Sequence, residues 1–600
     1  MTNKNFFRVM LLLALSCLSF AATPQQISLS WAATDALGRK LPDYQTADNQ
    51  GQDKYVAMFY WLWHMEKNVD SEPVNISEIV RNFPEAVNDY NHPVWAQNNA
   101  FGPCHWNEPL FGYYRSTDRW VLRKHAEMLA DAGVDVVVFD CTNAPFTWDA
   151  AFNELGEVWL EARNDGVKTP QFAFLCPFGP TDGSKDMVQK LWLEIYKRER
   201  FKDLWFYWKE KPLIMAYPDN LPEETRDFFT FRPCQPDYRR GPTRPDQWSW
   251  LEVYPQHGFA EYSPGKYEMV SVSVAQNATA ELAPAAMNDR KQVFGRSYTH
   301  KNGFDEKPDA HLYGYNFEEQ WSRVFELDPE LVFVTGWNEW VAGRFQNWQG
   351  TDNAFPDQFC DEYSRDIEPV KGSHGDNYYY QLVADIRKFK GTEKPPVAKQ
   401  SRSIDIDGDF ADWSSAGCVY YDHKGDTLSR NHRGYGSSLL YRNDSGRNDF
   451  VSLKAAFSEN NLFFYACCAD NIKRPANSGR MLLFIDIDRD KSTGWQGYDY
   501  LINSSQTAGG KASIEKNVDG KWSWIAAGGA DFATGGKEIE IGIPRAVICG
   551  EDASIDIEFK WADNIKGNGD VMDFYISGDT APPARFNYVF SSIETANAAK

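Results

Sequence analysis

A lone glutamate between two tryptophans is the feature of this sequence best suited to chemistry. In VFVTGWNEWVAGRF, residues 332–345, an apolar run leads into Trp337, Asn338, Glu339 and Trp340, and small residues then let the chain turn. Indole rings lower the dielectric around a carboxyl group and offer flat apolar faces on which a sugar ring can stack. Breaking a glycosidic bond needs carboxyl groups that move protons or stabilise positive charge at the anomeric carbon. We therefore expect Glu339 to be catalytic, with Asn338 and Trp340 binding substrate.

A second carboxylate ends another apolar run. VDVVVFDCTN, residues 134–143, is typical of a strand buried on both faces and reaches Asp140 near its end. We expect Asp140 to complete the catalytic pair, with the Asn143 amide binding a substrate hydroxyl. An alternative role for Asp140 is to cap the following turn or helix. An alternative role for Glu339 is to accept hydrogen bonds from backbone N–H groups at a strand end. Other candidate carboxylates are Glu252, Glu319 and the cluster DEYSRDIEP at 361–369.

Aromatic and histidine side chains could line a sugar subsite beside these carboxylates. Trp61 and His64 end the run KYVAMFYWLWH at 54–64, and His105 and Trp106 lie in PCHWNEP. Because such groups stack on sugar rings or bind hydroxyls, we expect all four to bind substrate. For each histidine, a structural hydrogen bond is the more common alternative. No HExxH or paired-histidine spacing predicts a zinc site, and the expected catalysis needs no cofactor.

The elements that position these residues follow a repeated pattern. From about residue 54 to 390, strand-like runs alternate with helical patterns such as those at 118–133 and 318–330. The predicted strands cover 54–64, 134–143, 170–179, 211–219, 228–233, 267–276 and 330–340. Seven or eight such repeats predict an α/β fold of the TIM-type (β/α)8 class, in which catalytic side chains meet at the carboxyl ends of the strands.

Composition and charge narrow the classes of partner. A chain of 600 residues is too long for one hydrophobic core, so we expect two or more domains. The net charge of -22 opposes binding to nucleic acid and to anionic lipid. No run of about twenty apolar residues after the N-terminus predicts a transmembrane segment. The aromatic fraction of 15% favours an oligo- or polysaccharide partner, with a large aromatic core as the alternative.

The N-terminus is typical of an export signal. In MTNKNFFRVMLLLALSCLSFAAT, basic residues precede an apolar run, and Ser19-Phe20-Ala21 has the small-x-small pattern of a cleavage site. We expect a signal peptide at 1–21 and an exported protein, which is periplasmic, extracellular or lipid-tethered at the cell surface through Cys17.

The pattern changes after the predicted barrel, which we expect to span 22–392. EKPPVAKQSRS at 393–403 has two prolines and mixed charge, as a linker does. Beyond it, short alternating strands separated by Gly, Asn and Asp turns predict an all-β sandwich domain at 404–600.

Three alternating aspartates in this second domain could bind a metal. Asp486, Asp488 and Asp490 could place their oxygens on one side of a strand end and hold calcium, with a solvated acidic turn as the equal alternative. SIDIDGDFADW at 403–413 resembles the opening strand of family 9-type carbohydrate-binding modules, and the segment at 482–502 is similar to a second feature of that group. The resemblance implies a carbohydrate-binding module.

The segment GWNEWVAG resembles the family 99 glycoside hydrolases, which are endo-α-mannosidases, and the related family 71 and WbsX-type proteins. Their last strand carries Asn-Glu-Trp-x-Glu-Gly, and residues 112–140 are similar to their segment leading into the second strand. An Ile-Glu-Pro substrate contact of the family is matched by Glu368. The resemblance covers much of 55–390 and implies a (β/α)8 barrel that acts on glycans.

Residue by residue, the resemblance matches Asn338, Glu339, Trp340 and Gly343. It implies that the glutamate at the position of Glu339 deprotonates a substrate 2-hydroxyl. The second glutamate of the family, its acid/base, falls on Ala342, so this chain departs from the family pattern at that position.

These patterns together predict an exported glycoside hydrolase that cleaves a glycosidic bond in an oligo- or polysaccharide, with Glu339 and Asp140 as the paired carboxylates. Ala342 motivates the alternative of a non-catalytic glycan-binding protein. A WbsX-like glycosyltransferase is the second alternative, but export opposes it because nucleotide-sugar donors are cytoplasmic.

Overall fold

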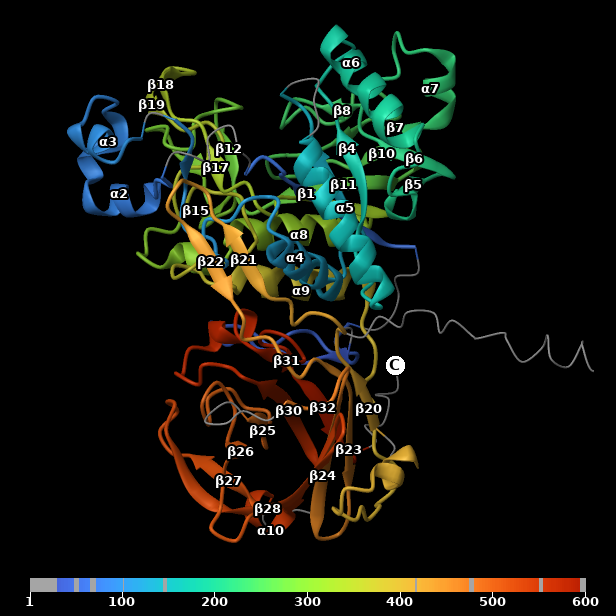
Figure 1. Cartoon of the computed structure of the whole chain (residues 1–600). Coiled ribbons are helices and arrows are strands. Elements are labelled where there is room, and N and C mark those ends of the chain that lie inside the picture. The colour runs from blue at the N-terminus through green and yellow to red at the C-terminus, as the bar shows by residue number, and fades with distance from the viewer. Residues whose placement is uncertain are drawn as a thin grey trace, which may run out of the picture.

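The computed structural model describes residues 30–47, 53–64, 72–100, 102–143, 148–415, 418–473, 480–549 and 554–593. The predicted signal peptide at 1–21 lies outside these residues and stays a prediction. Figure 1 shows a helix-rich N-terminal half and a C-terminal half made almost wholly of strands. No helix in the described part is both long and apolar enough to cross a membrane.

A curled sheet of six strands forms the centre of the N-terminal half. Its order is β10-β11-β16-β1-β3-β4, and every neighbouring pair except the β10–β11 hairpin is parallel. The strands are β10 (Phe259–Ser263), β11 (Lys266–Ser273), β16 (Leu331–Thr335), β1 (Tyr55–Tyr60), β3 (Val136–Asp140) and β4 (Gln171–Leu175). Runs such as YVAMFY and LVFVT are buried because side chains pack against both faces of a parallel sheet.

Short strand pairs continue the curl beyond β4. Parallel bridges join Phe172 to Trp205 and Leu175 to Met215, β6 pairs with β7, and β8 pairs with β9. Their bounds are β5 (Tyr207–Trp208), β6 (Lys211–Ile214), β7 (Thr230–Phe231), β8 (Cys234–Gln235) and β9 (Trp248–Ser249). Pro233 interrupts this side, because proline has no N–H to donate to a ladder. A closed ladder of eight strands is not present among the described residues.

The prediction of a (β/α)8 barrel is therefore confirmed only as a mixed α/β fold with a curled, mainly parallel sheet. Helices follow the strands and lie around the sheet (Figure 1). They are α4 (Arg119–Ala132), α5 (Asp149–Asn164), α6 (Asp182–Leu191), α7 (Glu223–Phe228), α8 (Tyr315–Leu327) and α9 (Asn377–Lys390). Gly133 ends α4 in the left-handed conformation, at φ 85°, which a residue with a Cβ rarely adopts.

Smaller elements fill the connections on the carboxyl side of the sheet. They are α2 (Ile76–Asn82), α3 (Pro93–Gln97), β2 (Cys104–His105), β12 (Gln276–Thr279), β13 (Val293–Phe294), β14 (Tyr298–Thr299), β15 (Gly303–Phe304), β17 (Val341–Ala342), β18 (Phe345–Trp348) and β19 (Thr351–Ala354). β17 pairs antiparallel with β2, which ties the chain after the last parallel strand to the loop that follows β1.

Strand register brings the predicted site residues to one edge of the sheet. Trp61 directly follows β1 and continues its register beside Asp140 of β3. Asp140 in turn pairs with Leu175 of β4. β16 ends at the same edge, shortly before Glu339. The carboxyl ends of parallel strands thus converge as the sequence pattern predicts.

The C-terminal half is an antiparallel sheet bent back on itself. Its path is β20-β23-β24-β29-β28-β27-β26-β25-β30-β31, and β32 also pairs with β30. The elements are β20 (Cys418–Tyr421), β23 (Phe450–Phe457), β24 (Asn461–Cys468), β25 (Met481–Asp486), β26 (Tyr500–Gln506), β27 (Ala512–Asn517), β28 (Trp524–Gly535), β29 (Glu538–Pro544), α10 (Arg545–Ile548), β30 (Asp556–Asp563), β31 (Asp579–Ala581) and β32 (Tyr588–Ser591). The rings of Phe464 and Phe559 pack 5.2 Å apart across the fold. This sandwich-like arrangement confirms the all-β prediction, while carbohydrate binding by this half stays a prediction.

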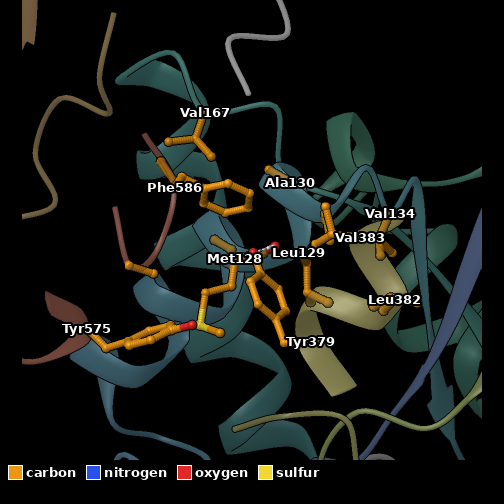
Figure 2. Close-up of a cluster of buried hydrophobic side chains, with 14 of the residues drawn as sticks. Met128, Leu129, Ala130, Val134, Val167, Tyr379, Leu382, Val383, Tyr575 and Phe586 are labelled. Atoms are coloured by element: carbon orange, nitrogen blue, oxygen red, sulfur yellow. Dashed lines mark hydrogen bonds between the residues drawn. The ribbon is translucent and has the colours of Figure 1, made fainter. Parts of the chain in front are cut away.

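A shared hydrophobic cluster joins the two halves. Figure 2 shows Met128 of α4 and Tyr379 of α9 beside Tyr575 and Phe586 of the C-terminal half. The Tyr575 hydroxyl also donates a hydrogen bond to Asp376 at 2.9 Å. Because apolar burial scales with the area removed from water, this contact stabilises the two halves against each other.

Two further segments cross the predicted domain boundary. The hairpin of β21 (Arg430–Arg433) and β22 (Leu440–Asn443) belongs to the C-terminal half, but Arg430 forms an ion pair with Asp118 at 2.8 Å. Near the N-terminus, the Trp31 ring lies 5.4 Å from that of Phe586. The predicted linker at 393–403 therefore separates two folding patterns whose surfaces remain in contact.

Candidate active site

The carboxyl ends of the parallel strands surround a cavity of about 190 Å³. Its aromatic lining includes Trp61, Trp63, Phe178, Tyr238, Trp250 and Trp348. Its polar lining includes Asp140, Asn143, Asn277, Glu339, Asp357 and Arg365. Sites for drug-sized ligands are typically about 300–1,000 Å³, so this cavity fits a single sugar unit better than an extended chain.

Glu339 reaches the cavity from the segment after β16. The residue is only 3% exposed, and its Oε2 accepts hydrogen bonds from Gln358 Nε2 at 2.9 Å and Arg365 Nη2 at 2.8 Å. Its backbone N–H donates to Asp366 Oδ1. These contacts hold the carboxyl group by one oxygen, and no described group donates to Oε1.

Burial sets the proton affinity of Glu339. It raises the pKa of the carboxyl group to about 8, Asp357 and Asp366 add to the rise, and the Arg365 guanidinium opposes it. At neutral pH most molecules therefore carry a proton on Glu339. A carboxylic acid that keeps its proton at neutral pH is the form that a general acid requires.

Gly336 allows Trp61 to form one wall of the cavity. A Cβ at position 336 would lie 2.2 Å from the Trp61 ring, which no side chain could occupy. Asn338 then fixes the Trp61 main chain, because its Oδ1 accepts from Trp61 N at 2.9 Å and its Nδ2 donates to Trp61 O at 3.1 Å. Asn338, predicted to bind substrate, is 1% exposed and positions Trp61.

Asp357 is a third carboxylate of the cavity, and no sequence pattern singled it out. It lies in a loop after β19, where no buried strand marks the position. Burial raises the pKa of Asp357, with Arg365 opposing the rise. Asp357 in turn raises the pKa of both Glu339 and Asp140. It therefore lies close enough to interact with each of the other two carboxylates.

Arg365 supplies the positive charge of the site. Its side chain is 1% exposed and lies over the Trp250 ring at 5.8 Å. Its Nε and Nη1 have no hydrogen-bond partner within the described residues. Arg365 belongs to the segment DEYSRDIEP, which the sequence marks only by its acidic residues.

Asp140 lines the cavity and also caps a turn. Its Oδ1 accepts from Thr142 N at 2.9 Å, and Asn143 Nδ2 lies 3.5 Å from its Oδ2. Burial raises the pKa of Asp140, while the contacts with Thr142 oppose the rise. The two roles considered for Asp140 are therefore compatible, because one oxygen serves the turn and the side chain still reaches the cavity.

Trp106, Trp340 and Glu368 lie in a buried layer outside the cavity. The two indole rings stack 4.7 Å apart at an angle of 10°. Glu368 Oε2 accepts from Trp340 Nε1 at 2.6 Å and Tyr114 Oη at 2.8 Å, and its Oε1 lies 2.9 Å from His125 Nε2. Trp106 Nε1 donates to Asp366 Oδ2 at 2.5 Å. Internal partners thus hold all three side chains that were predicted to bind substrate, and we propose no substrate contact for them.

His64 and His105 also lie outside the cavity lining. They are 1% and 2% exposed. The His64 ring packs edge-on against Tyr114 at 5.3 Å, and burial lowers the pKa of His64 to about 3. The His105 ring packs between Tyr113 and Tyr435, each at 4.8 Å. Both side chains therefore serve the core as neutral rings.

The remaining candidate carboxylates have structural partners. Glu252 is buried and lies 2.8 Å from His257 Nδ1, and Glu319 accepts from the backbone N–H groups of His300 and Lys301. Of the segment 361–369, only Arg365 lines the cavity.

The predicted calcium ligands separate in the structure. Carboxylate oxygens of Asp486 and Asp488 gather within 4.8 Å of one another together with Asp499. Asp490 is exposed and does not belong to this group. Lys491 Nζ lies 3.2 Å from Asp486 Oδ2 and supplies a positive charge there. Calcium at this position stays a prediction.

Comparison with known proteins gives distant matches to solved structures. No family model and no curated protein matches the chain. Two solved structures of the GH99 endo-alpha-mannosidase from Bacteroides thetaiotaomicron, one in complex with BIS-TRIS-propane, match at 14% sequence identity. Each match covers 57% of this chain and 98% of the other, with TM-scores of 0.34 and 0.32. They belong to the family that GWNEWVAG resembles, but similarity this low carries no argument about fold or activity.

Proposed function

We propose that this protein is a glycoside hydrolase that holds one sugar unit of an oligo- or polysaccharide in the cavity and cleaves the adjoining glycosidic bond. The observation that carries the proposal is the presence of Glu339, Asp357 and Asp140 on one small cavity with aromatic walls. Glycosidic cleavage by most such enzymes uses two carboxyl groups, and aromatic rings bind the apolar faces of sugars.

Glu339 takes the role of proton donor in this proposal. Its pKa of about 8 keeps it protonated at neutral pH. Its Oε2 accepts hydrogen bonds from Gln358 and Arg365, so Oε1 is the oxygen that carries the transferable proton. The proton passes to the glycosidic oxygen as the bond to the anomeric carbon breaks.

The second carboxylate is Asp140 or Asp357. Its role is to activate a water molecule or to attack the anomeric carbon, and which of these it does depends on its distance from the acid. One carboxylate oxygen of Asp140 accepts a hydrogen bond within a turn, whereas no described donor binds the Asp357 carboxylate. Asn143, Asn277 and the unpartnered Arg365 donors are placed to bind sugar hydroxyls.

The test of Glu339 uses leaving groups of different acidity. Glu339→Gln should lower turnover of natural glycans by about 10²–10⁴-fold, the usual contribution of a general acid. It should lower turnover of aryl glycosides with acidic phenols far less, because those phenols depart without protonation. Glu252→Gln is the matched control, since Glu252 is also a buried glutamate with its pKa raised, to about 7, but lies outside the cavity. An equal loss on both substrate types would contradict the assignment.

A non-catalytic glycan-binding protein is the alternative function. The hydrogen bond from Arg365 to Glu339, which occupies one carboxyl oxygen, and the presence of Ala342 at the family acid/base position favour it. Affinity electrophoresis separates the two proposals, because a binding protein would retain glycans that it leaves intact. We also propose that the protein is exported, on the evidence of the N-terminal pattern, and that its C-terminal half binds carbohydrate.

A further inference from the structure

Four aspartates form a cluster at the edge of the C-terminal half that faces α4, and neither the cavity nor the predicted calcium ligands include them. Asp422 and Asp426 follow β20, Asp449 precedes β23, and Asp579 begins β31. Carboxylate oxygens of Asp426, Asp449 and Asp579 all lie within 4.8 Å of one another. Asp422 interacts electrostatically with both Asp426 and Asp579, so it lies beside this group.

Every member of this aspartate cluster has an oxygen that no described group satisfies. These atoms are both carboxylate oxygens of Asp422 and the Oδ1 atoms of Asp426, Asp449 and Asp579. Asp422, Asp426 and Asp579 are 7%, 6% and 3% exposed. Buried polar atoms are nearly always hydrogen-bonded, and a buried carboxylate without a partner strongly destabilises the fold. Four such groups together offer the oxygen donors of a cation site.

The backbone orients two of these carboxylates. Asp449 Oδ2 accepts from Gly425 N at 2.8 Å, and Asp579 Oδ2 accepts from Phe450 N at 2.7 Å. Each side chain is therefore held by one oxygen while the other remains without a donor. These backbone contacts link the loop after β20, the start of β23 and β31. The fold itself therefore positions the two carboxylates.

Nearby lysines do not balance the four carboxylates. Lys124 Nζ lies 3.7 Å from Asp426 Oδ2, but it also lies 3.8 Å from Glu127 Oε2 and is shared between them. Lys560 donates to the Pro582 carbonyl, and burial lowers the pKa of Lys560 well below its usual value. His423, whose pKa is raised to about 9, and Arg123 also interact with Asp426. His423 is paired with Asp131, however, and Arg123 with Glu127 and Asp165. Among the described residues, no positive charge is therefore left to the four aspartates alone.

We propose that Asp426, Asp449 and Asp579 bind a calcium ion, with Asp422 as a fourth carboxylate beside it. Calcium takes oxygen ligands at about 2.3–2.6 Å, so two ligands of one ion lie at most roughly 5 Å apart, and oxygens of the three aspartates lie within that range of one another. Magnesium fits less well, because it keeps several water molecules and this cluster is buried.

The proposed ion lies where the two halves of the protein meet. Between Asp422 and Asp426, His423 Nε2 lies 3.0 Å from Asp131, and the Lys424 carbonyl accepts from Arg123 at 2.6 Å. Calcium bound to Asp426 fixes this loop, and the loop in turn contacts α4. Removal of calcium should therefore weaken the junction as well as the C-terminal half.

The test measures calcium binding and thermal unfolding of the full-length protein after chelation. Adding millimolar CaCl₂ should raise the midpoint of unfolding of the wild type by several degrees, and MgCl₂ should raise it less. Asp449→Asn and Asp579→Asn should weaken calcium binding by at least about tenfold and lose most of the shift. Asp531→Asn, at an exposed aspartate outside both acidic groups, is the matched control and should keep the full shift. Asp488→Asn, in the separate group with Asp486 and Asp499, should keep the part of the shift that the aspartate cluster supplies.

Two outcomes would overturn the proposal. The first is no calcium binding by calorimetry and no shift in the wild type, whatever the stability of the Asn variants. That result would mean that protons neutralise the cluster. The second is loss of the shift in Asp488→Asn with retention in Asp449→Asn, which would place calcium at the other acidic group. If the Asn variants fail to fold, terbium luminescence of the wild type and of Asp488→Asn is the deciding measurement. The proposal requires Asp488→Asn to keep a terbium site from which calcium displaces the terbium. Loss of that site in this variant would overturn the proposal.

Discussion

Arg365 and Glu339 lie side by side in the cavity wall, with Arg365 Nη2 donating a hydrogen bond to Glu339 Oε2 at 2.8 Å and both side chains at most 4% exposed. Burial drives the Glu339 carboxyl toward its protonated form, and Arg365 draws it toward the ionised form. The balance between these two effects determines the pH range in which Glu339 can donate a proton.

Removing the arginine charge should move the pH profile upward. In Arg365→Met the charge that lowers the pKa of Glu339 is lost, so the alkaline limb of kcat/KM should shift to higher pH while the maximal rate falls. Arg344→Met is the control, because Arg344 is a buried arginine outside the cavity. An alkaline limb that moves to lower pH would contradict the proposed role of Arg365.

Glu339 should make stability depend on pH. Its pKa is about 8 in the folded protein against an ordinary value of 4.5, so the folded state binds the proton more tightly. Wild-type stability should therefore fall as pH rises between these values, by at most about 1.4 kcal/mol per pH unit for this group. The range from pH 5 to pH 8 lies between the two pKa values. Across it, the free energy of unfolding of Glu339→Gln in urea should rise steadily relative to that of the wild type. A difference that is constant across this range would refute the pKa assignment.

Gly336 should be required for the cavity wall. Because a Cβ at 336 would lie 2.2 Å from the Trp61 ring, Gly336→Ala should displace Trp61 and lower kcat/KM by about tenfold or more, roughly 1.4 kcal/mol or above. Gly102→Ala is the control, since a Cβ at position 102 meets nothing within 4 Å. Steady-state kinetics with equal activity in both variants would show that Trp61 does not need its present position.

Trp250 should contribute to sugar binding rather than to the chemical step. Trp250→Ala should raise KM about fivefold with little change in kcat, as expected for the loss of about 1 kcal/mol of ring stacking. Phe345→Ala is the comparison, because Phe345 is 49% exposed and does not line the cavity. A fall in kcat at unchanged KM would instead place Trp250 in the catalytic step.

Glu368 should stabilise the fold without contacting substrate. Glu368→Gln alters its contacts with His125, Tyr114 and Trp340, so it should lower the free energy of unfolding by about 1–3 kcal/mol. KM should stay unchanged in the folded fraction. A raised KM with unchanged stability would restore Glu368 as a substrate contact, as the family resemblance implies.

The sequence predicts the part of the site that follows buried strands. Glu339, Asp140 and Trp61 all come after apolar runs, and strand register brings their positions to one edge. It does not predict which side chains of the Trp-Asn-Glu-Trp segment face inward. In the structure Glu339 enters the cavity, whereas Trp340 turns into the core.

The sequence does not predict that Asp357 and Arg365 belong to the site. They lie in loops, whose paths depend on contacts with distant parts of the chain and not on local periodicity. The aspartate cluster at Asp426, Asp449 and Asp579 is likewise assembled from segments far apart in sequence. The sequence pattern also predicts a closed barrel, whereas the described strands form a curled sheet. The strands after β4 are short and interrupted by proline.

The most direct measurement is a crystal structure of Glu339→Gln soaked with an oligosaccharide that the wild type cleaves. The proposed function predicts one sugar ring against Trp61 and Trp250, with its glycosidic oxygen within about 2.6–3.2 Å of the side chain at position 339. A sugar bound only elsewhere on the protein, with the cavity at Glu339 filled by water, would contradict it.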